Sequence, residues 1–583
     1  MIKTLLGSLR EYKHGSILTI LLSVLEAAFE ILIPLRMADL IDQGIDLGDM
    51  AVVWKFGIAI LILAALQLLT GVLSAHIAAK TSVGFSANLR QDMYDNVQTF
   101  AFSNIDKFST ASIVTRLTTD VTNIQNAYQM LLRMAVRGPV MLVFAMIVSF
   151  RINTTVALIF LAVIPIMALL LLLIICKVGP IFTRVFHTYD ELNNVVQENV
   201  RGIRVVKSFN QEDHEIKKFK GISQSIYEGY AAGERLLAFN SPIMQFFMYA
   251  CMILISWIGA KAIVASGNNA ALGMTTGDLT ALFSYATQIL MALMMLSMVF
   301  AMIIISLASA RRIAEVLEEK TDIDNPTDPI MAVRDGSICF EQVSFAYSTK
   351  SDKKVLNDIN LSIASGQTVG IIGSTGSSKS SLVQLIPRLY DVSSGQLLLG
   401  GVDVRKYDLD VLRNAVAMVL QKNELFSGTI KENLRWGNEN ATDEEIEEAC
   451  RLACADEFIQ SFTDKYDTYI EQGGANVSGG QKQRLCIARA LLKKPKVLIL
   501  DDSTSAVDTK TDASIQKSFA EFIPDTTKII IAQRVSSVQH ADLIVVMDDG
   551  KIAACGTHDE LLKTCDIYRE VYESQKKGDS DHE

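Results

Sequence analysis

The sequence lacks the marks of several common classes of protein. It contains no basic tract, its pI is about 5.4 and its formal net charge is −10, so we do not expect nucleic acid as a partner. The eight cysteines include no CxxC pair, and Cys450 and Cys454 have no further His or Cys nearby to complete a zinc site. A reducing cytosolic face suits these thiols.

The N-terminus also lacks a secretory cleavage site. Lys3, Arg10 and Lys13 precede an apolar stretch, as they would in a signal peptide. The stretch 17–35 is too long for the apolar region of a signal peptide, and no small-residue cleavage site follows it. We therefore interpret it as a retained first membrane span.

Long apolar runs are abundant. Half of the residues are hydrophobic and the mean hydropathy is +0.28, which excludes a cytosolic enzyme and a disordered chain. Six segments are long enough to cross a bilayer as helices, at about 17–38, 55–79, 131–150, 155–176, 242–265 and 279–308. The connections 80–130 and 177–241 are long, show helical periodicity and contain few helix breakers, so we expect cytoplasmic extensions of the membrane helices.

The charges divide the chain into two parts and orient it. Residues 1–320 hold 25 Lys/Arg against 23 Asp/Glu, which leaves 29 against 41 for the remainder. The long connections are rich in Lys and Arg, whereas the loop after the first span is acidic, so the positive-inside rule places both termini and the long connections in the cytoplasm. We expect a multi-pass plasma-membrane protein in contact with the lipid bilayer.

The order of segments predicts the domains and the fold class. We expect an α-helical six-span transmembrane domain with long cytoplasmic helical extensions (1–315), a polar linker (316–336) and an α/β P-loop nucleotide-binding domain (337–583). Strand-like segments alternate with helical ones after the linker, which is typical of a largely parallel sheet.

The stretch 368–382, TVGIIGSTGSSKSSL, is a strand, a Gly/Ser loop and a helix start. This pattern predicts a P-loop, in which backbone N–H groups hold phosphates, Lys379 neutralises them and Ser380 binds Mg²⁺. A serine, Ser378, replaces the second glycine of the pattern, and glycine is favoured where the backbone needs positive φ or close approach to a ligand. The predicted ATP-binding residues here are Gly373, Ser374, Thr375, Gly376, Ser377, Ser378, Lys379, Ser380 and Ser381.

Two further segments complete a nucleotide site. The segment KVLILDD reads as a buried strand that delivers Asp501 to its carboxyl end, where the carboxylate suits the water shell of Mg²⁺. The segment NVSGGQKQRLCIARALL (476–492) reads as a turn that opens an amphipathic helix, whose N-terminus can hold a γ-phosphate.

A P-loop, an SGGQ turn, an ILDD strand and SAVD (505–508), in this order, resemble the ATP-binding cassette of ABC transporters. The six preceding spans resemble the exporter-type transmembrane domain, and 106–121 and 196–212 resemble its two cytoplasmic loops with coupling helices. The resemblance implies that Tyr347 stacks on adenine and that Gln421 touches Mg²⁺. It also implies a D-loop at Asp508, and a signature facing the partner's nucleotide at Ser478, Gly479, Gly480 and Gln481.

Three positions depart from the family's pattern at one phosphate site. Asp502 stands where the family has a catalytic glutamate, Gln533 stands where it has a switch histidine, and Ser378 replaces the P-loop glycine. A base that is one methylene shorter loses reach toward the attacking water. We expect ATP to bind here, with slow hydrolysis at Asp502 and Gln533.

The degenerate site and the intact signature predict a partner. The chain resembles the degenerate subunit of bacterial heterodimeric exporters, so we expect a second, non-identical ABC half-transporter as its partner. We expect ATP and Mg²⁺ as cofactors. The resemblance also implies a hydrophobic or cationic small substrate of multidrug type. An exporter-fold importer of siderophore type and a lipid or peptide transporter stay open as alternatives. A non-hydrolysing ATP sensor is a third possibility, against which the intact signature argues.

Polar and soft side chains inside the spans offer candidates for a substrate cavity. Glu26 and Glu30 lie four residues apart, on one helix face deep in an apolar sequence. They predict either helix–helix contacts or a cavity for cationic substrates. Methionines cluster in the sixth span, and among them Met295 and Met298 are candidates for contact with apolar ligands, although methionines often only pack.

Overall fold

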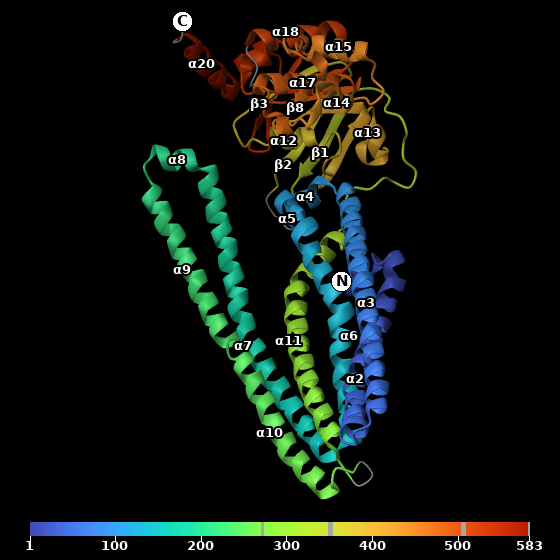
Figure 1. The fold of residues 1–583 in the computed structure, drawn as a ribbon. Helices are drawn as coiled ribbons and strands as arrows, with labels where there is room; N and C mark the ends of the chain where they lie inside the picture. Colours follow the sequence, from blue (N-terminus) through green and yellow to red (C-terminus); the bar gives the residue numbers. More distant parts are fainter. Residues whose placement is uncertain (270–272, 348–353, 503–508, 581–583) are drawn as a thin grey trace. The chain divides into compact units, whose positions relative to one another are not determined.

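The structure is a computed structural model that describes residues 1–269, 273–347, 354–502 and 509–580. The described chain divides into two compact units (Figure 1). The first unit comprises Met1–Gln98 and Ser109–Glu319, and the second comprises Thr99–Phe108 and Lys320–Glu583.

The first unit is helical. Six helical stretches in the described residues are long and apolar enough to cross a membrane, as the sequence predicts: Arg10–Ile45, Met50–Gln98, Thr110–Ile152, Thr154–Arg201, Glu212–Ser266 and Thr276–Glu318. Their main helices are α2 (Lys13–Leu40), α3 (Met50–Gln98), α6 (Val121–Ile152), α7 (Thr154–Arg201), α9 (Glu212–Leu237), α10 (Asn240–Ser266) and α11 (Thr276–Glu318). Short α1 (Ile2–Gly7) and α5 (Thr110–Thr115) accompany them.

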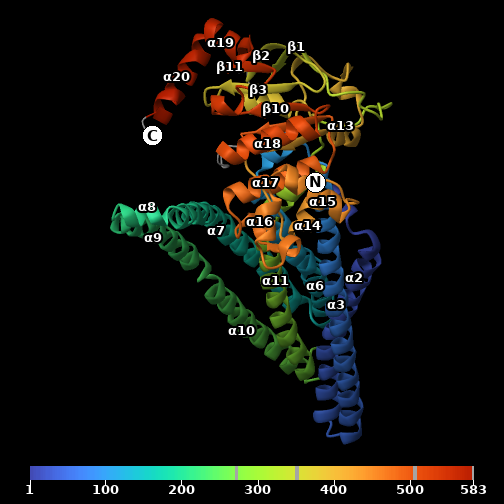
Figure 2. The ribbon, with the colours of Figure 1, turned by 90° about the horizontal axis from the view of Figure 1, so that it is seen from above.

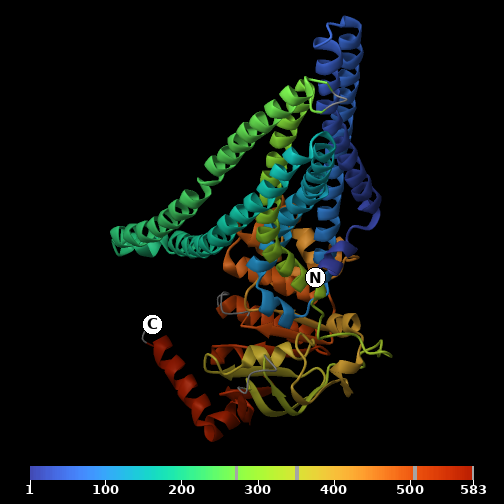
Figure 3. The same ribbon diagram turned by 90° about the horizontal axis from the view of Figure 1, so that it is seen from below.

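The long connections are helical, as their periodicity predicts. Helices α7 and α9 run side by side, and Figure 1 shows the short α8 (Ile203–Ser208) at their shared tip. Figure 3 shows the same pair from another side. These helices extend the fourth and fifth spans well beyond their apolar segments.

The second unit contains two main sheets. The strands of the larger one have the order β12-β11-β3-β10-β9-β6, in which only β12 is antiparallel to its neighbour. They are β3 (Thr368–Gly373), β6 (Val416–Val419), β9 (Val497–Asp501), β10 (Thr527–Ile531), β11 (Leu543–Asp548) and β12 (Lys551–Gly556). The smaller, antiparallel sheet has the order β2-β1-β4-β5, with β1 (Ile338–Phe345), β2 (Leu356–Ile363), β4 (Ser394–Leu399) and β5 (Val402–Asp403).

Helices surround the sheets of this unit, and the last helix, α20 (Asp566–Ser580), projects away from the sheets (Figure 2). The helices are α12 (Lys379–Gln384), α13 (Leu409–Ala415), α14 (Ile430–Arg435), α15 (Asp443–Leu452), α16 (Asp456–Gln460), α17 (Gly479–Leu491), α18 (Thr509–Phe522), α19 (His558–Thr564) and α20 (Asp566–Ser580). A two-stranded sheet pairs β7 (Gly428–Thr429) with β8 (Tyr469–Ile470). Strands β9 and β10 are buried along their whole length, as expected for parallel strands with both faces covered.

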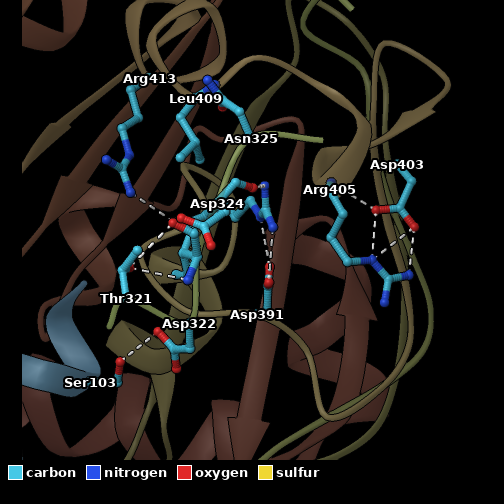
Figure 4. Close-up of polar contacts among 12 residues, drawn as sticks. Ser103, Thr321, Asp322, Asp324, Asn325, Asp391, Asp403, Arg405, Leu409 and Arg413 are labelled. Carbon is cyan, nitrogen blue, oxygen red and sulfur yellow. Dashed lines mark hydrogen bonds and ion pairs between the residues drawn. The ribbon is translucent and has the colours of Figure 1, made fainter. Parts of the chain in front are cut away.

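The segment that follows the last membrane helix is attached to the second unit (Figure 4). Asp322 accepts a hydrogen bond from Ser103, which lies on α4 (Phe102–Phe108), at 2.8 Å. The carbonyl oxygen of Asp324 accepts from Arg388, and Asn325 exchanges hydrogen bonds with Asp408 and the backbone of Leu409. Part of the predicted linker, residues 322–325, is therefore hydrogen-bonded to the second unit, including α4.

Candidate nucleotide-binding site

Three neighbouring parallel strands deliver the predicted phosphate-site residues to one edge of the larger sheet. Ile531 at the end of β10 pairs with Asp501 of β9 on one side and with Ile371 of β3 on the other. Because the carboxyl ends of parallel strands meet at the same edge, the P-loop, the Asp501–Asp502 pair and the loop after β10 converge there. Ligands of open α/β sheets bind at this edge.

The P-loop backbone has the shape that its sequence predicts, with strain at one residue. A Cβ at Gly373 would overlap the backbone carbonyl oxygen of Met547, so this position requires glycine. Gly376 has a φ of 88°, which glycine adopts freely. Ser378 has a φ of 71°, a left-handed conformation that costs a residue with a Cβ about 1–2 kcal/mol. Ser378 therefore replaces the glycine of the pattern at a position where the backbone has a positive φ.

The cation of the loop and the carboxylate of β9 are both partly removed from water. The Lys379 ammonium group donates to the carbonyl oxygens of Gly373 and Ser374, both at 2.8 Å. Burial lowers the pKa of Lys379, and the charges of Asp502 and Asp501 offset part of that shift. Asp501 is 3% exposed, and its burial raises the pKa of its carboxyl group, against which its interactions with Ser380 and Lys379 act.

Asp502 is held by two amide groups. The Gln533 side chain donates to Oδ2 of Asp502 at 2.5 Å, and the Gln421 side chain donates to the same oxygen at 3.3 Å. Asp502 itself has a φ of 49°, a conformation that aspartate tolerates better than most residues. The oxygen that faces these donors is engaged in the free protein, before any water molecule or phosphate reaches it.

Most of the predicted residues line one cavity of about 320 Å³. Its lining comprises Gly373, Thr375, Gly376, Ser378, Lys379, Ser380, Ser381, Gln421, Asp501, Asp502, Ile531 and Gln533. Ser374 and Ser377 are not part of the lining but support it, because both provide oxygens that accept from Lys379. Ile531 was not identified as a lining residue from the sequence. Its position could have indicated this role, because it is the last residue of buried β10, directly before the loop 532–538 that we call the switch loop.

The predicted adenine-stacking residue, Tyr347, lies beside the P-loop helix. Its hydroxyl group is 2.8 Å from the hydroxyl group of Ser381. The residue is 47% exposed, so its ring is accessible to a ligand. The rings of Phe345 and Tyr390 contact it edge-on at 4.9 and 5.1 Å between centroids. Tyr347 is thus a braced, accessible aromatic surface next to the phosphate cavity.

The signature residues form the start of a helix and do not line this cavity. Ser478 caps α17, accepting from the backbone N–H of Gln481, while the Gln481 side chain accepts from the backbone N–H of Ser478. This capping box shapes the turn, and the flanking Gly479 and Gly480 present N–H groups without side chains. The predicted D-loop residue, Asp508, lies outside the described residues.

The ligand chemistry of the cavity fits Mg²⁺. The Ser380 hydroxyl donates to Asp501 at 2.9 Å, and the side chains of Gln421 and Asp502 supply further oxygens to the same cavity. Hydroxyl, carboxylate and amide oxygens are the ligands that Mg²⁺ prefers. Ser380, Gln421 and Asp501 are therefore suited to hold the ion that accompanies a nucleotide.

Glu26 and Glu30 share a partner on another membrane helix. The Arg137 guanidinium group on α6 lies 3.0 Å from Glu26 and 2.5 Å from Glu30 of α2. A Cβ at Gly71 of α3 would come within 3.1 Å of the Glu26 carboxylate, so α3 packs closely against this cluster. Two carboxylates of α2 thus share one guanidinium group, and this cluster joins α2 to α6.

The methionines of α11 are divided between surfaces. Met291 and Met294 line a cavity of about 210 Å³ with α10, whereas Met295 and Met298 are not part of its lining. The other lining residues are Asn240, Ser241, Met244, Gln245, Met248, Thr287 and Leu290. The cavity is apolar and soft, with several uncharged hydrogen-bonding groups and no charged residue.

Comparison with known proteins agrees with this geometry. A family model described as ABC transporter transmembrane region matches residues 16–293, and one described as ABC transporter matches residues 356–505. The ABC transporter ATP-binding protein YfiB of Bacillus subtilis is 37% identical over 570 residues, which cover 98% of both chains. The chain belongs to the ABC transporters. It combines the membrane region and one ATP-binding cassette, and is thus a half-transporter.

Two further similarities describe this ABC transporter more closely. An ATP-dependent lipid A-core flippase of Desulfotalea psychrophila is 33% identical over 493 residues, which cover 84% of both chains. The structure of a bacterial Atm1-family ABC exporter with ATP bound matches with a TM-score of 0.80 at 24% identity, over 97% of this chain and 99% of that one. The predicted exporter-type fold is confirmed, and the cassette marks an ATP-hydrolysing transporter in a membrane.

Restoring glycine at position 378 tests the strain in the P-loop. Ser378→Gly relieves the left-handed serine, so we expect the free energy of unfolding of the cassette to rise by about 0.5–1 kcal/mol. Ser374→Gly is the matched control, because Ser374 is not among the residues with positive φ and its substitution should lower stability by about 0.5–1 kcal/mol. Thermal unfolding of the purified chain checks the pair. Equal destabilisation by both would contradict the strain.

Proposed function

We propose that this chain is one subunit of a heterodimeric, ATP-driven exporter of hydrophobic or amphipathic compounds in the plasma membrane, with its cassette in the cytoplasm. Its own P-loop site binds MgATP and hydrolyses it slowly. Its signature, Ser478–Gln481, completes the working site of a non-identical half-transporter. The contact between the Gln533 amide and the Asp502 carboxylate carries this proposal.

This contact supports slow hydrolysis for two reasons. A general base must accept a proton from the attacking water, and the Asp502 oxygen that faces Gln533 and Gln421 already accepts two hydrogen bonds. Aspartate is also one methylene shorter than the glutamate of the family's pattern, about 1.5 Å in reach, and such a displacement costs about 100-fold in rate. An amide at position 533 stabilises the aspartate in this arrangement and leaves no imidazole at the phosphate end.

The signature supports the partner. Its serine, glycines and glutamine are all present, and the capping box keeps the turn in a defined shape. These groups do not line the chain's own phosphate cavity. In a site built from one chain's P-loop and another chain's signature, these signature groups would contact the partner's nucleotide. A pure ATP sensor would not need an intact signature.

Exposed apolar residues at the tip shared by α7 and α9 also support the presence of a second chain. Phe209 and Val205 on the segment after α7 are 70% and 59% exposed. An open groove of about 450 Å³ lies nearby between α7, α8 and α9. Its lining residues include Val200, Ile203 and Phe219. The cassette carries a separate groove of about 270 Å³ at which Phe426 and Trp436 stack 4.1 Å apart. We propose that α8 of each subunit docks in the groove of the other.

In this scheme binding, not chemistry, is the contribution of the chain's own site. Tyr347 stacks on the base, and Lys379 and the P-loop N–H groups hold the phosphates. Ser380 and Asp501 would hold Mg²⁺, which would supply positive charge beside the phosphates. Closure of the two cassettes then moves α4 and α8, which couple to the membrane helices. Hydrolysis at the partner's P-loop, assisted by Ser478 of this chain, reopens the pair.

A second candidate function is translocation of a lipid, favoured by the 33% identity to a lipid A-core flippase. The polar groups in the membrane argue for a different substrate charge. The Glu26–Glu30–Arg137 cluster is formally −1, and the cavity between α10 and α11 is uncharged. Both disfavour phosphate-bearing headgroups and suit neutral or cationic amphiphiles.

Three substitutions test the division of labour between the two ATP sites. In the complex with its partner, Asp502→Ala should lower ATPase only modestly, because this site lacks an efficient base. Ser478→Ala should be severe, since losing an electrostatic contact to the transferred phosphate costs about 10²–10³ in rate. Lys379→Ala should fall between them by weakening nucleotide retention. Steady-state ATPase measures the order, and equal damage from Asp502→Ala and Ser478→Ala would make Asp502 a working base.

Substitution of Glu30 tests the substrate charge. Glu30→Gln leaves Arg137 paired with Glu26 and removes the excess negative charge, so export of cationic dyes should fall several-fold while that of neutral dyes stays within about twofold. Dye efflux from cells or vesicles measures both. Glu26→Gln is the matched comparison, and an equal loss for both dye classes with reduced thermal stability would assign the cluster to helix packing alone.

A further inference from the structure

We propose that Gln575 in the C-terminal helix α20 positions the switch loop, and thereby sets how strongly the site distinguishes ATP from ADP. The inference rests on the proposed ATP site but not on the heterodimer. Gln575 lies outside every motif in the sequence, and it does not line the phosphate cavity. It acts through Gln533.

The Gln575 side chain bridges two backbone groups of the switch loop. Its Nε2 donates to the carbonyl oxygen of Gln533 at 2.8 Å, and its Oε1 accepts from the N–H group of Val535 at 2.8 Å. A side-chain amide that pairs with a donor and an acceptor two residues apart fixes the backbone between them. A neighbouring β-strand would form the same pair of backbone hydrogen bonds with Gln533 and Val535. Here a side chain on a helix about forty residues later in the sequence forms them.

The helix that carries Gln575 is itself anchored. Val535 is buried in a cluster with Leu561 of α19, Tyr568 of α20 and Cys565, which lies between the two helices. The Tyr568 hydroxyl group lies 2.7 Å from Nδ1 of His558. The switch loop is therefore packed against the C-terminal segment by the side chain of Val535 and hydrogen-bonded to α20 through its backbone.

The other end of the loop is tied to a different helix. The Ser537 hydroxyl donates to Oδ2 of the buried Asp512 on α18 at 2.8 Å. With Gln575 at one end and Asp512 at the other, the loop has little freedom, and the Gln533 side chain is directed at Asp502 in the cavity. Gln533 thus owes its placement to backbone contacts that lie outside the cavity.

The consequence concerns one end of the nucleotide. Gln533 lines the cavity together with Asp502 and Lys379, and its side-chain amide has two N–H groups, of which Asp502 accepts one. In the proposed site the second N–H group is available to the γ-phosphate, which ATP has and ADP lacks. Releasing the backbone of Gln533 lets its amide leave this place. ATP then loses a fixed contact, whereas ADP, held by the P-loop and Tyr347, loses none. The loss is a change in selectivity between nucleotides rather than a general loss of binding.

The test measures equilibrium binding of MgATP and MgADP to the purified full-length chain. In Gln575→Ala we expect the Kd for ATP to rise about 5- to 10-fold, the range for one or two lost hydrogen bonds, with the Kd for ADP unchanged. Glu573→Ala is the matched control, because Glu573 is exposed and lies on the same helix two residues before Gln575. Its two Kd values should equal those of the unaltered chain.

Two further variants keep the result interpretable. Gln575→Glu preserves the shape and the acceptor for Val535 but places a carboxylate against the Gln533 carbonyl oxygen, so it should reduce ATP selectivity even if Gln575→Ala is poorly folded. Lys379→Ala should weaken both nucleotides; if it weakens neither, the proposed ATP site itself is wrong. Unchanged ATP affinity in both Gln575 variants, or an equal loss of ATP and ADP binding, would overturn the role of Gln575.

Discussion

The parallel pairing of β3, β10 and β9 is the constraint on which the nucleotide site depends. The register that pairs Ile531 with both Ile371 and Asp501 sets the ends of three strands level with one another. Each strand then passes directly into a different chemical element: the phosphate loop, the carboxylate pair and the switch loop. A shift of register in any strand would separate Ser380 from Asp501, or Gln533 from Asp502, which now lie within hydrogen-bond distance.

Two of the three unusual residues of the site contact each other, and the third lies in the phosphate loop of the same cavity. Ser378 strains the phosphate loop, Asp502 shortens the reach of the base, and Gln533 supplies an amide that binds the shortened base. The Gln533 amide satisfies the carboxylate with one N–H group and keeps its second N–H group for a phosphate. The substitutions are therefore mutually consistent with the proposed site that retains nucleotide, and the capping box of the signature lies outside the lining of this cavity.

Motifs with local geometry could be predicted from the sequence, and contacts between distant segments could not. The glycine pattern predicted the loop and marked position 378 as one where glycine is favoured, because backbone sterics are a property of a few consecutive residues. The pairing of Glu26 and Glu30 with Arg137 joins helices about a hundred residues apart, so the sequence left packing and cavity roles open. Gln575 gave no signal, because an amide in an amphipathic helix is ordinary, and only the fold brings it to the switch loop.

The ATPase rate of this chain, measured alone and then with its partner half-transporter, tests the central claim most directly. The account predicts little turnover by the purified chain in detergent, because every site it can form with itself contains Asp502 and Gln533, and a sharp rise when the partner supplies a site completed by Ser478. Robust turnover by the chain alone would contradict the account, since it would require Asp502 to work as an efficient base in the presence of the Gln533 amide.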